Sequence, residues 1–307
     1  MQDIAQRAAG RRETSQSAAV LPRRAALATM ALGLPGLGGC SVGAALSAMT
    51  AKGEGRLLAD QSFGPDPRQS ADLFLPGRIE TGTPAILFFY GGSWNRGDRE
   101  TYRFVGHALA ARGCIVAVAD YRLYPQVKYP AFLDDGALAL RWFRAQLPRL
   151  GAAAAPVYLM GHSAGAYNAA MLALDARWLA AVGERPQALA GWIGLAGPYD
   201  FLPIGNPDVR PVFGHPDVAP DSQVFAHVRA GAPAAFLGAA TRDDLVDPQR
   251  NTAGLARRLR EVGVPVVERF YDQANHMTLI GAFAGPLRWV GPVLADVADF
   301  VGARVPA

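Results

Sequence analysis

The chain has 307 residues, half of them apolar, so it can bury the core of one large domain or two small ones. Its formal charge at neutral pH is +4, but residues 1–39 contain five arginines and two acidic residues. The remaining 25 basic and 24 acidic residues leave a net charge of +1. This balance argues against a nucleic-acid-binding surface.

The first 39 residues are typical of an export signal. Arginines precede an apolar run over residues 25–39, which Pro35 interrupts and which is too short to favour a membrane-spanning helix. Residues 37–40, Leu-Gly-Gly-Cys, resemble a bacterial lipoprotein signal, in which the cysteine becomes the lipidated first residue; simple cleavage and an uncleaved anchor are the alternatives. Arg23 and Arg24 resemble a twin-arginine signal. We therefore expect an exported bacterial protein, either periplasmic or a lipoprotein anchored through Cys40, with residues 40–56 as a flexible tether.

From residue 57 onward, strand and helix patterns alternate, which indicates an α/β fold with a mostly parallel sheet of eight strands and helices on both faces. The first two strands are expected at the sheet edge, and Cys114 begins a buried strand where a free thiol behaves as a small apolar residue. Residues 197–232 are rich in proline and glycine and too long for a routine connection, so we expect an irregular excursion over the functional site. The expected strands cover 57–62, 70–75, 84–90, 114–119, 156–160, 190–195, 234–238 and 264–271, and the expected helices cover 100–112, 131–147, 164–174, a segment that includes 255–259, and 286–301.

The sequence Gly161-His162-Ser163-Ala164-Gly165 lies where a buried strand should pass into a helix. Glycines on both sides of Ser163 leave no Cβ where strand and helix backbones pass closely, so the turn can hold the serine oxygen exposed in a strained conformation. This strand-turn-helix pattern is typical of a nucleophile elbow. A chance match is the alternative, and only the other parts that such chemistry needs can decide.

A serine hydroxyl needs a base to take its proton, and the base needs a carboxylate to orient it. In hydrolases built on this elbow, serine, acid and histidine follow one another along the chain. That order favours His276, which comes directly after the last predicted strand; a surface or structural histidine is the alternative. Asp243 and Asp244 both follow the preceding strand and either can supply the acid, whereas Asp247 precedes a proline and is better interpreted as a helix cap.

Backbone N–H groups must also stabilise the oxyanion that forms when the serine attacks a carbonyl group. The N–H of Ala164, directly after Ser163, is one candidate. The loop after the strand 84–90 begins with a glycine pair, and its Gly92 and Ser93 are the other candidate donors. An ordinary turn is the alternative interpretation of this glycine pair.

With these parts the chain resembles the α/β-hydrolase superfamily, in the esterase branch related to hormone-sensitive lipase, bacterial acetyl or feruloyl esterases and kynurenine formamidases. The resemblance covers roughly residues 57–303 and implies a catalytic domain over residues 57–307 with the α/β-hydrolase fold. The spacing to Val246 implies that Asp243 is the acid. One position departs from the family pattern, because Tyr90 stands where the family usually has a histidine. The residues that carry the resemblance are Tyr90-Gly91-Gly92-Ser93-Trp94, Asp120-Tyr121-Arg122-Leu123, Gly161 to Gly165, Asp243 to Val246, and His276.

The resemblance and the residues together predict a serine hydrolase that cleaves carboxylic esters through Ser163, His276 and Asp243 and an acyl-enzyme intermediate. Tyr90, Trp94, Tyr124 and His162 are candidates for the substrate pocket, with core packing as the alternative. We expect a small-molecule ester as the partner and no cofactor or metal, since the sequence lacks a zinc-binding helix motif, clustered cysteines and a phosphate-binding loop. An amide or formamide hydrolase on the same triad, or a non-catalytic binding protein that retains the fold, are the competing hypotheses.

Overall fold

The computed structural model describes residues 39–303, and their side chains from residue 43 onward. Residues 1–38 of the expected export signal and the side chain of Cys40 lie outside this part. Within it, no helix has both the length and the apolar character needed to cross a membrane.

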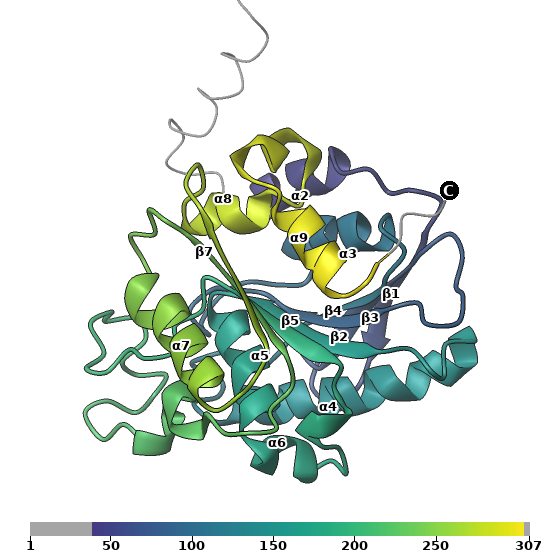
Figure 1. Ribbon diagram of the computed structural model, residues 1–307. Coiled ribbons are helices and arrows are strands. Elements are labelled where there is room, and N and C mark those ends of the chain that lie inside the picture. Colours follow the sequence, from purple (N-terminus) through teal and green to yellow (C-terminus); the bar gives the residue numbers. More distant parts are fainter. Residues whose placement is uncertain (1–38, 304–307) are drawn as a thin grey trace, which may run out of the picture. The chain divides into compact units, whose positions relative to one another are not determined.

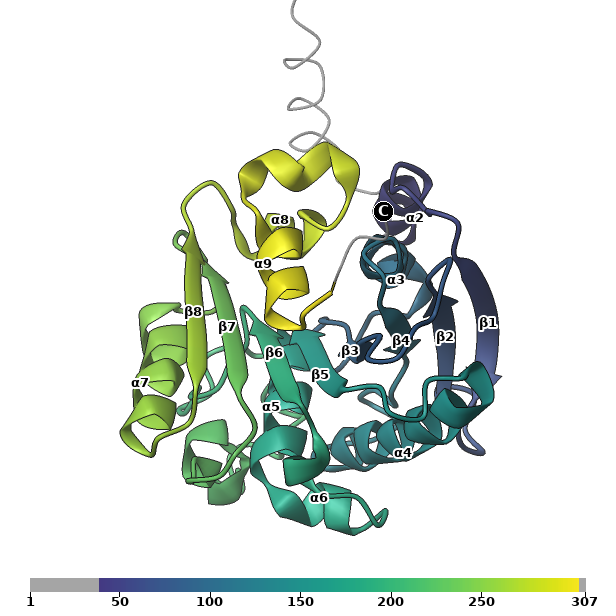
Figure 2. The same cartoon turned by 45° about the vertical axis from the view of Figure 1, so that its right-hand side comes forward.

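Eight strands form one sheet in the order β1-β2-β4-β3-β5-β6-β7-β8, as the alternating pattern predicted (Figures 1 and 2). Pairing is parallel from β4 to β8, whereas β2 is antiparallel to both β1 and β4. β3 and β4 are apolar throughout and completely buried because helices cover both faces of the sheet. The strands are β1 (Arg56–Ser62), β2 (Ser70–Leu75), β3 (Ala85–Phe89), β4 (Ile115–Ala119), β5 (Val157–His162), β6 (Gly191–Leu195), β7 (Ala235–Ala240) and β8 (Val266–Tyr271).

Helices cover both faces, with α3 and α9 on one side of the sheet and α4, α5 and α6 on the other (Figures 1 and 2). Every residue of α5 is buried, and its many alanines allow this helix to lie close to both the sheet and α4. The α-helices are α2 (Gly39–Ala48), α3 (Arg103–Ala110), α4 (Ala131–Gln146), α5 (Ala164–Leu174), α6 (Ala176–Ala180), α7 (Gly254–Glu261), α8 (His276–Gly281) and α9 (Val293–Phe300). Shorter helical turns are η2 (Glu100–Tyr102), η3 (Leu147–Leu150), η4 (Pro186–Ala188), η5 (Pro220–Ser222), η6 (Val224–His227), the π-helical η7 (Gln249–Ala253) and η8 (Gly285–Val290).

Four local predictions differ from the structure. The segment 40–56, expected as a flexible tether, contains α2, which lies so close to η2 that a Cβ on Gly43 would overlap the backbone of Thr101. β2 is the second strand rather than an edge strand, and nearly all of its residues are buried. The helix expected over 286–301 is divided into η8 and α9, because Pro292 has no N–H with which to continue a helix. The segment after β8, expected as a loop, contains α8.

The excursion over residues 197–232 is packed against the domain even though it contains only short turns of helix. Phe213 and Phe201 lie within 4.9 Å and 6.2 Å, centroid to centroid, of the Trp94 ring, and Tyr167 of α5 joins the same aromatic cluster. These contacts attach the excursion to the loop that follows β3. Cys114 has a free thiol and is buried just before β4, and burial raises its pKa to about 12.

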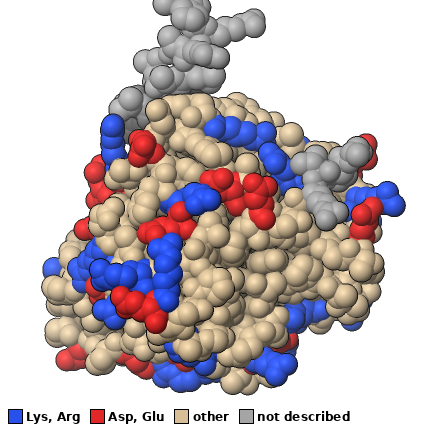
Figure 3. All heavy atoms as spheres, in the orientation of Figure 1, with Lys and Arg blue, Asp and Glu red and all other residues tan. Residues whose placement is uncertain are grey.

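Basic and acidic side chains are interspersed on the face drawn in Figure 3. Among the described residues, charged side chains form ion pairs such as Arg250 with Asp200 at 3.0 Å and Arg260 with Glu268 at 2.6 Å. This face therefore presents mixed charges rather than a continuous basic surface.

Candidate active site

Ser163 occupies the tight turn between β5 and α5. Its backbone has φ 55° and ψ −122°, a left-handed conformation that is strained for a residue with a side chain. A Cβ on Gly161 would overlap the carbonyl of Gly165, and a Cβ on Gly165 would overlap the carbonyl of Phe89 at the end of β3. The two glycines are thus required by the close approach of three backbones. As a result, the half-buried Ser163 lies at the carboxyl-terminal edge of the sheet, where open α/β sheets bind ligands.

His276, after β8, and Asp243, in the loop after β7, form a hydrogen-bonded chain to Ser163. The His276 Nδ1–H donates to Asp243 Oδ2 at 2.7 Å, so the neutral ring accepts at Nε2 from the Ser163 hydroxyl, 2.9 Å away. The Asp243 side chain is completely buried, and its Oδ1 accepts the N–H groups of Leu245 and Val246, each at 2.9 Å. Burial alone would raise the pKa of Asp243, but the hydrogen bonds from His276 and from these two amides outweigh it and lower the pKa.

Of the two neighbouring aspartates, Asp243 is therefore the one that contacts His276, while Asp244 is exposed. His276 is the first residue of α8 rather than part of a loop. Asn275 caps this helix: its side chain accepts the N–H of Thr278 at 2.8 Å, and the Thr278 hydroxyl accepts the N–H of Asn275 at 2.8 Å. The Asn-x-x-Thr spacing is a capping-box signal, and it could have predicted this helix from the sequence.

The loop after β3 passes directly over the serine. A Cβ on Gly91 would lie 2.9 Å from the Ser163 Cβ, so only glycine permits this approach. Beyond it, Gly92, Ser93 and Trp94 all have positive φ values, and the Gly92 carbonyl accepts the N–H groups of Asn95 and Arg96, each at 3.1 Å. Gly92 and Ser93, the candidate oxyanion donors, thus directly follow the glycine that approaches Ser163.

Ala164 begins α5, so its N–H has no partner within the helix. The three candidate oxyanion donors, Gly92, Ser93 and Ala164, therefore come from the two segments that meet at Ser163.

The four pocket candidates lie in different environments. Tyr90 is completely buried, and its hydroxyl donates to Asp120 at 2.8 Å and accepts from Arg68 at 2.6 Å. Trp94 is buried in the aromatic cluster, with its Nε1–H donated to Asn168 at 2.9 Å. His162 is also buried. Tyr90, Trp94 and His162 are thus packed inside the protein, and of the four candidates Tyr124 alone is partly exposed.

In a comparison with protein families, the chain matches the family described as BD-FAE. The match covers residues 71–259, more than half of the chain, and includes the elbow, the loop after β3 and Asp243. The chain belongs to the BD-FAE family. This BD-FAE chain also has the α/β-hydrolase fold of the esterase branch.

Relatives among curated proteins are esterases by name. The BD-FAE chain is 30% identical over 150 residues to the probable isoprenylcysteine alpha-carbonyl methylesterase ICME of Oryza sativa, covering 48% of this chain and 36% of that protein. It is 26% identical over 242 residues to Esterase LipC of Mycobacterium tuberculosis, covering 73% of this chain and 58% of that protein. The matched segment thus spans between about a third and somewhat over half of these relatives.

A solved structure shows the same fold. Esterase 2 of Thermogutta terrifontis is 22% identical to this BD-FAE chain, with a TM-score of 0.67 and coverage of 81% of this chain and 96% of that one.

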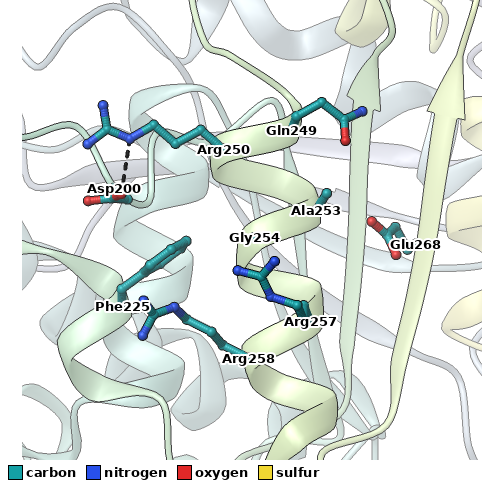
Figure 4. Close-up of a pocket in the computed structure, with 9 residues that line it drawn as sticks. All are labelled: Asp200, Phe225, Gln249, Arg250, Ala253, Gly254, Arg257, Arg258 and Glu268. Atoms are coloured by element: carbon teal, nitrogen blue, oxygen red, sulfur yellow. Dashed lines mark hydrogen bonds and ion pairs between the residues drawn. The ribbon is translucent and has the colours of Figure 1, made fainter.

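A surface hollow of about 630 Å³ lies along η7 and α7, and none of Ser163, Asp243 and His276 lines it (Figure 4). Arg250 in this hollow pairs with Asp200 at 3.0 Å, and the Arg258 guanidinium lies 4.7 Å from the centre of the Phe225 ring. These contacts attach the excursion to η7 and α7. The hollow supplies no nucleophile and base of its own.

Proposed function

We propose that this BD-FAE protein hydrolyses carboxylic esters, with Ser163 as nucleophile, His276 as general base and acid, and Asp243 as the group that orients His276. The observation that carries the proposal is the continuous hydrogen-bonded chain from Asp243 Oδ2 through the His276 ring to Ser163 Oγ, with distances of 2.7 Å and 2.9 Å. These are the distances that general base catalysis requires. The esterase names of its relatives support the same reaction class.

The geometry supports the following sequence of steps. The Ser163 oxygen attacks the ester carbonyl carbon as His276 Nε2 takes its proton, and the N–H groups of Gly92, Ser93 and Ala164 stabilise the carbonyl oxygen as it becomes negative. The C–O bond then breaks, and the leaving alcohol takes the proton from His276. Water, deprotonated by His276, attacks the acyl-enzyme; the carboxylic acid leaves and the proton returns to Ser163. Asp243 remains ionised throughout and stabilises the imidazolium.

Two measurements test this function. A fluorophosphonate probe is expected to label the wild-type protein and not Ser163→Ala, and wild type is expected to hydrolyse short-chain nitrophenyl esters. Equal labelling of the two proteins would show that Ser163 is not the nucleophile. A folded wild-type protein that neither reacts with the probe nor turns over any ester would instead be a binding protein.

Ester and amide substrates need the same triad, so a direct comparison decides between them. We expect turnover of the nitrophenyl esters to exceed turnover of N-formyl aromatic amines. Efficient hydrolysis of the formamides alone would replace the ester proposal with a formamidase.

We further propose that the chain is exported and lipidated at Cys40, which would place the catalytic domain at a membrane surface. The sequence of residues 37–40 supports this proposal. Mass analysis of the mature N-terminus tests it: a diacylglyceryl-modified Cys40 is expected, and a mature protein that retains residues 1–39 with an unmodified Cys40 would contradict it.

A further inference from the structure

His162, the residue directly before Ser163, is a polar side chain buried in the interior of the protein. It is the last residue of β5, pairs with Leu195 of β6 in the parallel ladder, and is only 1% exposed. The proposed reaction steps do not use it. A buried polar side chain beside a nucleophile calls for a physical reason.

On one side, the His162 ring contacts the start of α8. Its Nε2 lies 3.0 Å from the backbone carbonyl oxygen of His276. Because a carbonyl oxygen can only accept, Nε2 must carry the proton, and the neutral ring has its lone pair on Nδ1. The two histidine rings are 5.0 Å apart, centroid to centroid. His162 therefore holds His276 both by its backbone and by ring contact.

On the other side, the His162 ring contacts the loop after β3. A Cβ on Gly91 would lie 3.1 Å from His162 Nδ1, so the ring fills the space directly behind that loop. Nδ1 is buried and has no hydrogen-bond partner among the described residues. Burial, followed by the nearby charge on His276, lowers the pKa of His162 to about 3, so the ring stays neutral when His276 takes a proton.

We propose that His162 is a positioning residue for the reaction proposed above: its neutral ring links the start of α8 to β5 and so sets the approach of His276 to Ser163. The inference rests on the proposed function. The reason is geometric, since β5 is fixed between β3 and β6, whereas α8 has one turn and a half and follows a loop. The hydrogen bond from His162 in β5 to the His276 carbonyl therefore fixes the start of α8, and with it the catalytic base, relative to the sheet.

A matched pair of variants separates this role from simple packing. In His162→Gln the side-chain amide nitrogen can reach the position of Nε2 and still donate to the His276 carbonyl. In His162→Asn the amide nitrogen reaches only the position of Nδ1, so the hydrogen bond is lost while a polar side chain remains. His107→Gln, on α3 and against Phe74, controls for replacement of a partly buried histidine elsewhere.

The measurement is steady-state hydrolysis of a nitrophenyl ester, with kcat expressed per site that reacts with a fluorophosphonate probe, so that unfolded protein is not counted. We expect His162→Asn to lose roughly tenfold to a hundredfold in kcat with KM within about twofold, because a displacement of about an ångström costs rate rather than binding. His162→Gln is expected to keep kcat within about fivefold of wild type, because its amide N–H can still donate to the His276 carbonyl.

Equal kcat values for the Gln and Asn variants, counted per reactive site, would overturn the positioning role. A change confined to KM would also overturn it, because the ring would then act in substrate binding. A folded wild-type protein without ester turnover would instead overturn the proposed function. The two failures are thus distinguishable.

Discussion

The loop after β3 and the two segments that carry Asp243 and His276 meet at Ser163, but different kinds of contact hold them in place. The first is supported by buried charges. Arg68 donates to the Tyr90 hydroxyl and to the Gly97 carbonyl, each at 2.6 Å, and Asp120 accepts from the Tyr90 hydroxyl at 2.8 Å and from the side chain and backbone N–H of Arg99. Both ends of the loop are therefore tied to one ionic network.

The loop that carries Asp243 and the start of α8, which carries His276, depend on fewer and mostly uncharged contacts. Two backbone amides orient Asp243, the Asn275 cap starts α8, and neutral His162 contacts the His276 carbonyl. The neighbouring side chains Leu245 and Met277 are 72% and 60% exposed. Substitutions in the ionic network under the loop after β3 (below, the β3 loop) should therefore mainly reduce stability, whereas substitutions around His276 should mainly reduce the rate.

The largest expected effect is on the rate side. Asp243→Asn keeps the shape of the side chain but replaces the carboxylate that accepts from His276 Nδ1–H, so the histidine can adopt the wrong tautomer and its imidazolium loses stabilisation. We expect a loss of roughly 10⁴-fold in kcat. Asp244→Asn, one residue away and exposed, is the matched control and should stay within about threefold of wild type, as surface substitutions usually do. The reverse ranking of the two variants in ester turnover would assign the acid to Asp244.

The next effect is on stability. Asp120→Ala removes a carboxylate that is only 4% exposed and that pairs with both Arg99 and Arg68. Removing one member of a buried ion pair costs about 3–5 kcal/mol, and the lower end applies because Arg99 also pairs with Asp60 and Asp72. Asp60→Ala is the control, since its side chain is 70% exposed and such pairs contribute about 1 kcal/mol or less. Urea unfolding of both variants provides the comparison; equal losses would mean that burial does not distinguish the two carboxylates.

The fold was predictable because its strands are continuous apolar runs separated by turn residues. β3 and β4, for example, consist of Ala-Ile-Leu-Phe-Phe and Ile-Val-Ala-Val-Ala, and both lie within a residue of the expected bounds at each end. Propensity could not place β2 second in the sheet, because strand order depends on pairing between distant segments. Nor did it predict α2 and α8, since short helices depend on tertiary contacts and caps more than on periodicity.

The site was predictable as far as the chain order of serine, acid and histidine allows. That order alone did not decide whether Asp243 or Asp244 contacts the histidine. In the structure, Asp243 accepts the hydrogen bond from His276. The supporting residues were not predictable, because their roles arise from contacts across the fold. Tyr90 is 30 residues from Asp120 and 22 from Arg68, and His162 is 114 from His276. No local pattern marks such partners.

Support by the neutral His162 ring predicts that the stability of the protein depends on pH. The pKa of His162 is lowered to about 3, while in the unfolded chain it should be near 6.5. Below pH 6.5 His162 binds a proton in the unfolded state but not in the folded state. The contribution of the neutral His162 ring to stability is therefore complete above pH 6.5 and is lost as the pH falls towards 3. We expect the free energy of unfolding to fall by about 1.4 kcal/mol per pH unit from this group between pH 6 and 4. Asp243 faces the same ring, and its charge moderates the effect.

Urea unfolding of wild type and His162→Gln at pH 7, 6 and 5 measures this slope. The variant lacks the titrating ring and should lose less stability over this range, while His107, whose pKa burial also lowers, contributes equally to both proteins. Parallel curves for the two proteins would show that His162 is not held neutral by the fold.

A weaker effect is expected for Tyr90, which stands where the resemblance to esterases implied a histidine. Tyr90→Phe removes the hydroxyl that links Arg68 to Asp120, which should cost about 1–2 kcal/mol of stability as buried partners lose a hydrogen bond. The ring itself stacks on Tyr121 and Tyr102, with centroids 4.9 Å and 5.5 Å away, so the β3 loop should keep its position.

We therefore expect kcat/KM for a nitrophenyl ester to stay within about fivefold of wild type, since the packing that positions Gly91 over Ser163 is retained. Thermal unfolding and ester turnover, measured on the same sample, separate the two effects. A hundredfold loss of kcat at unchanged stability would place the Tyr90 hydroxyl in the reaction itself. The contacts under the β3 loop would then affect the rate of the reaction and not mainly the stability of the protein.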